Sequence, residues 1–148
     1  MFQKILVCLD GSKLAEQVLP YASEQSARFD SCLVLFEVVS LASFPIPTST
    51  WRNPVRVPDN QLAGAEAAAR DYLNGLALPL REKGLQVQCV TLIGVPTESI
   101  VSYAEENRFD LVVMATHGCS GLGRLVLGSV AQYVIEKSRL PTLLIKPK

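Results

Sequence analysis

The chain lacks several features that would assign it to a particular class of protein. Its 14 basic and 14 acidic side chains balance to a formal net charge of zero. No overall field therefore draws it to nucleic acid or to an anionic membrane, and we expect neither as a partner. The chain has one histidine, and its four cysteines include no C-x-x-C pair, which argues against a zinc site.

Long apolar segments and two familiar nucleotide-binding signatures are also missing. There is no charged-then-apolar leader and no apolar run of the roughly 20 residues that a membrane span needs, so we expect a soluble, cytoplasmic protein. No G-x4-G-K-[ST] occurs, and no G-x-G-x-x-G follows the first apolar run. These absences exclude a P-loop NTPase and a dinucleotide-binding enzyme.

What is present is enough for a stable core. We interpret residues 1–148 as one domain, of a size that buries about 68–70% of its unfolded surface without disulfides or metals. Hydrophobic residues make up 49% of the chain. Cys8, Cys32 and Cys89 lie within apolar runs and are interpreted as small core residues.

Apolar runs alternate with amphipathic segments along the chain. The expected strands are 4–9, 31–39, 85–94, 111–115 and 141–147, and the expected helices are 12–29, 59–83, 97–107 and a last one from 129 onward. This alternation predicts an α/β fold, a three-layer Rossmann-like sandwich around a five-stranded parallel sheet. Right-handed crossovers with one change of winding direction predict the strand order 3-2-1-4-5. Pro20 should kink or break the first helix.

The stretch Asp110–Val130, DLVVMATHGCSGLGRLVLGSV, runs from a buried strand through a glycine-bearing loop into a helix. Chain that leaves a parallel strand in this way enters the crevice where α/β sheets bind ligands. Gly118 and Gly128 allow close backbone approach, and Ser129 is an N-cap or first-turn residue beside free N–H groups. The pattern predicts an anion cradle. Alternatively, Gly128 only terminates the loop and Ser129 only caps the helix.

Energetics favour a ligand larger than phosphate. A helix N-terminus gives an anion about 0.3–1 kcal/mol, or up to roughly 2 in a sheltered site, whereas micromolar binding needs about 8 kcal/mol. The loop amides, the Ser129 hydroxyl and a buried organic part of the ligand must supply the difference, so a nucleotide fits better. Asp10 ends the first strand and is expected to meet the loop in the crevice, where it either contacts the ligand or bonds its own turn.

The sequence resembles the universal stress protein family over essentially its whole length, from KILVCLDGS at the start to the segment that begins at Asp110. Nucleotide-binding members of that family carry G-x2-G-x9-G-[ST]. Gly118 and Gly128-Ser129 match its second and third elements, and Ala115 stands in place of the first glycine. The resemblance implies an adenine nucleotide α-hydrolase-like fold that binds ATP, or AMP, with Mg or Mn accompanying the phosphates.

By position, the resemblance also implies roles for single residues. Asp10 corresponds to the carboxylate that holds the ribose hydroxyls or the base region, and Val38 or Val39 corresponds to the backbone contact with adenine. Ala115 stands at the first position of the motif. The residues that correspond to the family's phosphate cradle are Gly118, Gly128, Ser129 and Val130. The family further implies a homodimer through the last edge strand, which is 141–146 here.

The implied function is that of a sensor or regulator in the stress response that binds ATP or another adenine nucleotide. Two alternatives stay open. One is a slow ATPase or a self-phosphorylating enzyme, with Ser129 or a bound water as the reacting group. The other is a dimeric stress protein that binds no nucleotide and acts through its dimer surface and the proline-rich loop 40–58, which holds Trp51. His117 is interpreted as a residue that shapes the loop, and no catalytic residue is assigned.

Overall fold

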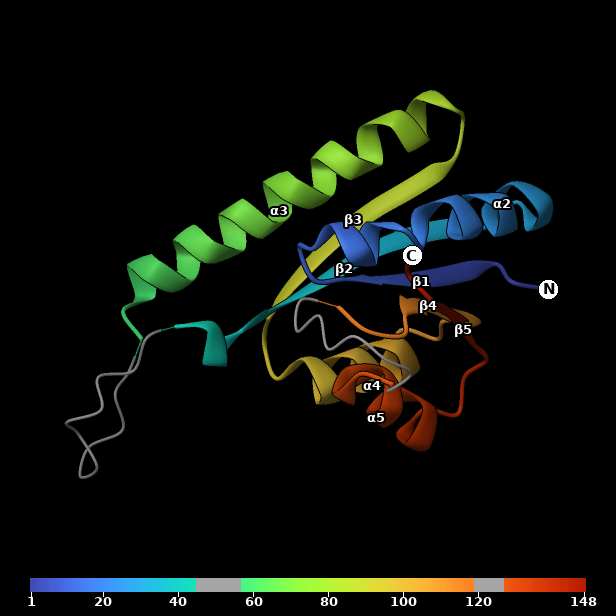
Figure 1. Cartoon of the computed structure of the whole chain (residues 1–148). Coiled ribbons are helices and arrows are strands. Elements are labelled where there is room, and N and C mark those ends of the chain that lie inside the picture. The colour runs from blue at the N-terminus through green and yellow to red at the C-terminus, as the bar shows by residue number, and fades with distance from the viewer. Residues whose placement is uncertain (45–56, 119–126) are drawn as a thin grey trace.

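The computed structural model describes residues 1–44, 57–118 and 127–148. They form one sheet in which all neighbouring strands are parallel, in the order β3-β2-β1-β4-β5 (Figure 1). The strands are β1 (Lys4–Leu9), β2 (Cys32–Ser40), β3 (Gln86–Gly94), β4 (Leu111–Ala115) and β5 (Thr142–Ile145). The predicted parallel sheet and its strand order are confirmed. Trp51 and most of the loop 40–58 lie outside the described residues.

Helices cover both faces of this sheet. They are α1 (Lys13–Glu16), α2 (Leu19–Phe29), α3 (Asp59–Glu82), α4 (Pro96–Glu106) and α5 (Ser129–Lys137), with a short 3-10 turn, η1 (Leu41–Ser43). Helices α1, α2 and α3 pack on one face, and α4 and α5 pack on the other. The predicted three layers are thus present. Of the helices in the described ranges, none has the length and apolar character needed to cross a membrane.

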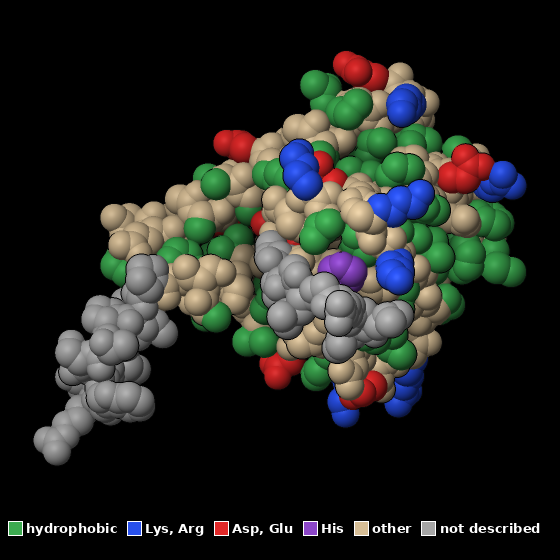
Figure 2. Space-filling view, in the orientation of Figure 1, with side chains coloured by type: hydrophobic (Ala, Val, Ile, Leu, Met, Phe, Trp, Pro, Cys, Tyr) green, Lys and Arg blue, Asp and Glu red, His purple; other side chains and the backbone are tan. Residues whose placement is uncertain are grey.

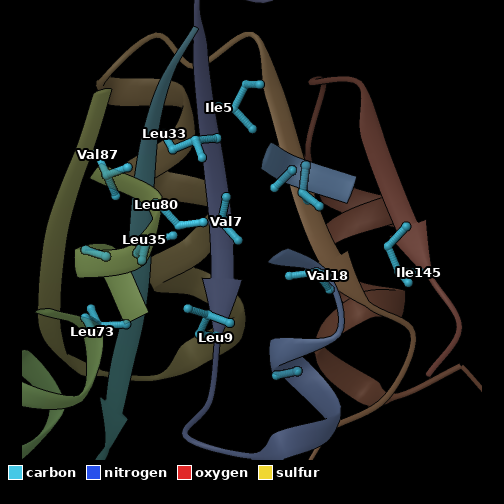
Figure 3. Close-up of a cluster of buried hydrophobic side chains, with 14 of the residues drawn as sticks. Ile5, Val7, Leu9, Val18, Leu33, Leu35, Leu73, Leu80, Val87 and Ile145 are labelled. Atoms are coloured by element: carbon cyan, nitrogen blue, oxygen red, sulfur yellow. The ribbon is translucent and has the colours of Figure 1, made fainter. Parts of the chain in front are cut away.

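The two cores follow from the alternation of side chains along the central strands. Ile5, Val7 and Leu9 of β1 point to the face that α1, α2 and α3 cover (Figure 3), while Leu6 and Cys8 point to the other face. Residues 5–9 are all buried, as the continuous apolar run predicted. This strand therefore lies at the centre of the molecule and ends at the predicted crevice.

The helix expected at 12–29 is broken, as the proline predicted. The Ser12 hydroxyl caps α1 by accepting a hydrogen bond from the Ala15 N–H at 3.1 Å. The break falls at Gln17 and Val18, upstream of Pro20, which occupies the first turn of α2. A proline fits there because the N–H that it lacks has no partner within the helix.

Candidate functional site

A cavity of about 730 Å³ opens at the carboxyl edge of the sheet. Its walls come from the ends of β1, β2 and β4, from the starts of α1, α4 and α5, and from α3. All the residues that the sequence assigned to the ligand line this cavity: Asp10, Val38, Val39, Ala115, Gly118, Gly128, Ser129 and Val130. The fold thus brings these positions together, while their contacts with a ligand remain predictions.

The turn between β1 and α1 holds the Asp10 carboxylate in place. Its Oδ1 accepts hydrogen bonds from the Ser12 N–H at 3.0 Å and from the Ser12 hydroxyl at 2.6 Å. Gly11, between them, has a φ of 80°, in the left-handed region that favours glycine. Of the two roles weighed for Asp10, the bond to its own turn is therefore present. Because the side chain is exposed and lines the cavity, it also remains accessible to a ligand.

Gly118 approaches this carboxylate from the other side. A β-carbon at Gly118 would overlap the Oδ2 of Asp10. Among the described glycines, Gly11 and Gly84 have a positive φ, in the left-handed region. The φ of Gly118 lies outside that region. Gly118 is therefore needed for close packing against Asp10, and not for an unusual backbone conformation.

Gly128 brings the two ends of the glycine-bearing loop together. Its N–H donates to the Thr116 carbonyl at 2.7 Å. A β-carbon at Gly128 would lie 3.1 Å from that carbonyl oxygen and 3.3 Å from the Cα of His117. The His117 ring bonds the Thr116 hydroxyl through Nδ1 at 3.0 Å. The role of His117 in shaping the loop stays a prediction, and its side chain reaches the molecular surface, where charged side chains of both signs are interspersed (Figure 2).

The start of α5 presents backbone donors to the cavity. Gly128 is the N-cap, has an extended conformation (φ −61°, ψ 152°) and makes no side-chain capping bond, so Ser129 is a first-turn residue. The first N–H groups of a helix have no intrahelical acceptor. Here they belong to Ser129, Val130 and Ala131, all of which line the cavity. N–H groups at the positive end of a helix dipole are suited to the binding of an anion.

Ala115 fits its position without strain. It is the last residue of β4, it is 8% exposed, and its methyl group belongs to the core beneath α1, α2 and α3. The described non-glycine residues with positive φ are Asp30 and Arg108, so Ala115 has a backbone conformation that any L-residue can adopt. Position 115 therefore does not require a glycine for its backbone conformation, and Ala115 also contributes to the cavity wall.

Part of the cavity wall is apolar. Val38 and Val39, at the end of β2, line it together with Pro96 and Ile100 of α4. Cys8 also contributes, and burial raises the pKa of its thiol to about 12, which favours the protonated thiol over the nucleophilic thiolate. Apolar walls with a few convergent polar groups are typical of sites for small organic ligands.

Glu37 is a cavity residue that the sequence interpretation missed. It pairs with Leu9 across β1 and β2, and it is half-buried. Burial, followed by the charge of Asp10, raises the pKa of its carboxyl group to about 7. The available signal was a single acid inside the apolar run CLVLFEVV. A charged residue at such a position needs a structural or functional reason, because burying a charge is costly.

Metal ligands are not gathered at this site. Within residues 1–44, 57–118 and 127–148, no group of three or more His, Cys, Asp or Glu side chains is placed to hold a metal ion. The chemistry that these residues do offer consists of carboxylates, hydroxyls and backbone amides around an apolar cavity.

Comparison with known proteins identifies similar sequences. The model of the universal stress protein family matches residues 1–146. Universal stress protein MJ0531 of Methanocaldococcus jannaschii is 31% identical over 148 residues, which cover 99% of this chain and 83% of the relative. Universal stress protein MJ0577 of the same organism is 27% identical over 157 residues, which cover 100% of this chain and 97% of the relative.

Solved structures share the fold. The structure of MJ0577 aligns with a TM-score of 0.81 at 27% identity, over 100% of this chain and 98% of that chain. A universal stress protein in complex with cAMP aligns with a TM-score of 0.65 at 20% identity, covering 97% and 96% of the two chains. A family protein from Arabidopsis thaliana with AMP bound aligns with a TM-score of 0.62 at 16% identity, covering 99% and 92%.

Proposed function

Because this chain belongs to the universal stress protein family, we propose that its cavity binds an adenine nucleotide and that the protein acts as a nucleotide-binding sensor or regulator in the stress response. The observation that carries this proposal is the placement of Asp10 and of the start of α5, whose N-cap Gly128 makes no side-chain capping bond, around one cavity of about 730 Å³. The AMP and cAMP held by two structural neighbours are in line with it.

The phosphate end of the ligand would lie at the start of α5. The N–H groups of Ser129 and Val130, the Ser129 hydroxyl and the N–H of Gly118 supply the donors. A hydrogen bond to a charged group contributes about 1.5–3 kcal/mol, so three or four such bonds and the helix dipole account for most of the roughly 8 kcal/mol of micromolar binding.

The nucleoside end would lie between Asp10 and the end of β2. The exposed carboxylate of Asp10 accepts hydrogen bonds from the ribose hydroxyls, because an ionised carboxylate is an acceptor only. The backbone at Val38 or Val39 contacts the adenine edge, and the apolar side chains of Pro96 and Ile100 enclose the ring. The buried area of the base adds hydrophobic stabilisation at about 25 cal/mol per Å².

We extend the proposal to ATP as the physiological ligand, with Mg²⁺ or Mn²⁺ carried by its phosphates. The described residues provide no metal cluster of their own, so the ion would be held by phosphate oxygens and would offset their charge. We further propose a cytoplasmic location and a homodimer formed through β5. This strand lies at the edge of the sheet, and an unpaired edge is a template for pairing with a second copy.

The test is titration calorimetry of nucleotide-free protein with Mg-ATP, AMP and cyclic AMP. We expect binding in the micromolar range for at least one of them, with saturation at one ligand per chain. A folded, nucleotide-free protein that gives no binding signal with any of the three would overturn the proposal. The matched glycine variants described in the Discussion locate the bound ligand in this cavity.

A further inference from the structure

The cavity contains the carboxyl group of Glu37, which is not one of the proposed contacts with the nucleotide. Glu37 follows Leu33 and Leu35 on the face of β2 that α1, α2 and α3 cover. Its Oε1 lies 3.5 Å from the position of a β-carbon at Gly11, beside the turn that holds Asp10. It therefore stands next to the carboxylate that is proposed to bind the ribose.

The surroundings of Glu37 disfavour its ionised form. The Oε2 atom is buried and has no hydrogen-bond partner among the described residues. An ionised carboxylate oxygen without a donor loses its hydration and gains nothing in return, so such groups take up a proton. In line with this geometry, the pKa of Glu37 is raised to about 7, first by burial and then by the charge of Asp10.

The titratable groups around Glu37 come from several elements. Asp10 at the end of β1 and Tyr72 of α3 interact with it electrostatically. The Tyr72 hydroxyl donates to Glu16 of α1 at 3.3 Å, and Glu16 in turn pairs with Lys13 at 2.9 Å. His117 lines the same cavity from the loop after β4. On the side of β3, Glu37 is in register with Thr91, which does not titrate.

A bound nucleotide would add negative charge to this setting. Its phosphates enter a cavity that already holds Asp10, so the ionised form of Glu37 becomes still less favourable. We propose that Glu37 faces the bound ligand as a neutral carboxylic acid, and that binding of an anionic nucleotide is coupled to the uptake of one proton at this residue. The inference rests on the proposed nucleotide function and adds a pH-dependent recognition residue to it.

The direction of the coupling follows from linkage. At pH values below the pKa of Glu37 in the free protein, the residue is protonated both in the free and in the nucleotide-bound protein. The nucleotide affinity then does not change with pH through this residue. Above that pKa, the free protein must take up a proton in order to bind. The nucleotide affinity then falls as the pH rises, by up to about tenfold per pH unit. This fall ends when the pH reaches the pKa of Glu37 in the nucleotide-bound protein. The protein would thus report nucleotide and proton concentration together.

The experiment is calorimetry of AMP with the wild type and with Glu37→Gln from pH 6 to 9, in two buffers of different ionisation enthalpy. Glutamine has nearly the same shape and stays neutral, so we expect this variant to hold the low-pH affinity across the range. Above pH 7, the AMP affinity of the wild type should fall by up to about tenfold per pH unit. On binding AMP, the wild type should take up close to one more proton than the variant. Titration of the AMP phosphate is common to both proteins and cancels in the comparison.

Two controls isolate the residue. Glu24→Gln removes an exposed carboxylate of α2 that pairs with Arg28, and it should keep the wild-type pH profile. Adenosine, which has no phosphate, should show less proton uptake than AMP. In the free protein, ¹³C NMR of the Glu37 carboxyl carbon should show a titration midpoint near pH 7. Addition of AMP should move this midpoint to a higher pH.

The outcomes distinguish failure of the coupling from failure of the proposed function. Equal pH profiles for AMP binding to the wild type and Glu37→Gln would overturn the coupling and leave nucleotide binding intact. A Glu37 midpoint near 4.5 in the free protein would overturn the neutral carboxyl whatever the ligand does. Absence of AMP binding to both proteins at every pH, if it extends to ATP and cyclic AMP, overturns the proposed function and the coupling with it.

Discussion

Asp10 and Gly118 are in contact at the ends of two neighbouring strands, β1 and β4, and the Oδ2 of Asp10 fills the space that a side chain on Gly118 would need. The Oδ1 of the same carboxylate is held by Ser12. Asp10 is thus fixed between its own turn and the glycine-bearing loop. This contact joins the proposed ribose end of the cavity to its phosphate end.

Substitution of Gly118 by alanine should therefore weaken nucleotide binding. The added methyl group cannot share the position of Oδ2, so either the carboxylate or the loop must move. We expect Gly118→Ala to raise the dissociation constant for AMP at least tenfold, which corresponds to about 1.4 kcal/mol, as measured by calorimetry.

Gly75→Ala is the matched control for this variant. Gly75 lies in α3, and a β-carbon there meets nothing within 4 Å. The substitution should leave the affinity unchanged and stabilise the fold by about 0.5–1 kcal/mol, because alanine is the better helix former. If Gly118→Ala and Gly75→Ala bound AMP equally well, the contact with Asp10 would have no role in binding.

Removal of the Ser129 hydroxyl should affect only ligands that carry phosphate. Ser129 is exposed and Gly128 is the N-cap of α5, so Ser129→Ala removes no capping bond and should leave the melting temperature unchanged. The loss of one hydrogen bond to a charged oxygen should weaken AMP binding about tenfold. Adenosine binding should not change. An equal loss for adenosine would place the hydroxyl at the nucleoside end.

The carboxyl group of Glu37 should make stability depend on pH. Its pKa is raised from the ordinary value of 4.5 to about 7 in the folded protein. The unfolded chain therefore releases its proton first as the pH rises, and folded-state stability falls between about pH 4.5 and 7. Glu37→Gln lacks this dependence. After allowance for the solvent screening of a half-exposed group, we expect it to be about 1 kcal/mol more stable than the wild type at pH 8.

Denaturant unfolding at pH 4 and pH 8 measures this effect. The difference between the two proteins should be close to zero at pH 4, where Glu37 is neutral in both the folded and the unfolded wild type. An equal difference at both pH values would show that the substitution acts through packing and not through charge.

Blocking the outer edge of β5 should give a monomer if this strand forms the dimer. The Pro141 carbonyl accepts a hydrogen bond from Val112 of β4, and the Ile145 carbonyl accepts one from Thr116, just after β4. In this parallel pair the N–H of Thr142 therefore faces away from β4. Thr142→Pro removes that outward donor and keeps the bonds to β4, in a position where an edge strand tolerates proline. Sedimentation velocity should show a dimeric wild type and a monomeric variant, with unchanged circular dichroism. A dimeric variant would point to another interface.

Much of the fold could be predicted because its signals are local. The continuous apolar run 111–115 matches β4, and the alternation of apolar runs with amphipathic segments predicted the parallel sheet with its helices. Pro20 predicted a break, but the break lies at Gln17 and Val18, because a proline is accommodated in the first turn of a helix and the chain must bend before it.

The candidate site could be predicted for a topological reason. Parallel strands end at the same edge of a sheet, so residues that follow β1, β2 and β4 must meet there. This is why Asp10, Val38 and Gly118 line one cavity although they are far apart in the sequence.

The sequence by itself determined the layers and the strand order, because hydrophobic periodicity and the handedness of crossovers depend on the chain alone. The resemblance to the family added residues such as Val38 and Val39 to those expected at the crevice. Only the tertiary structure decided what Gly118 and Glu37 do. Gly118 is required by contact with Asp10 and not by its own φ. Burial and the charge of Asp10, which act on Glu37 only after folding, disfavour the ionised form of its carboxyl group and raise its pKa. Solvation and electrostatic interactions act through space, so neither property can be read from sequence neighbours.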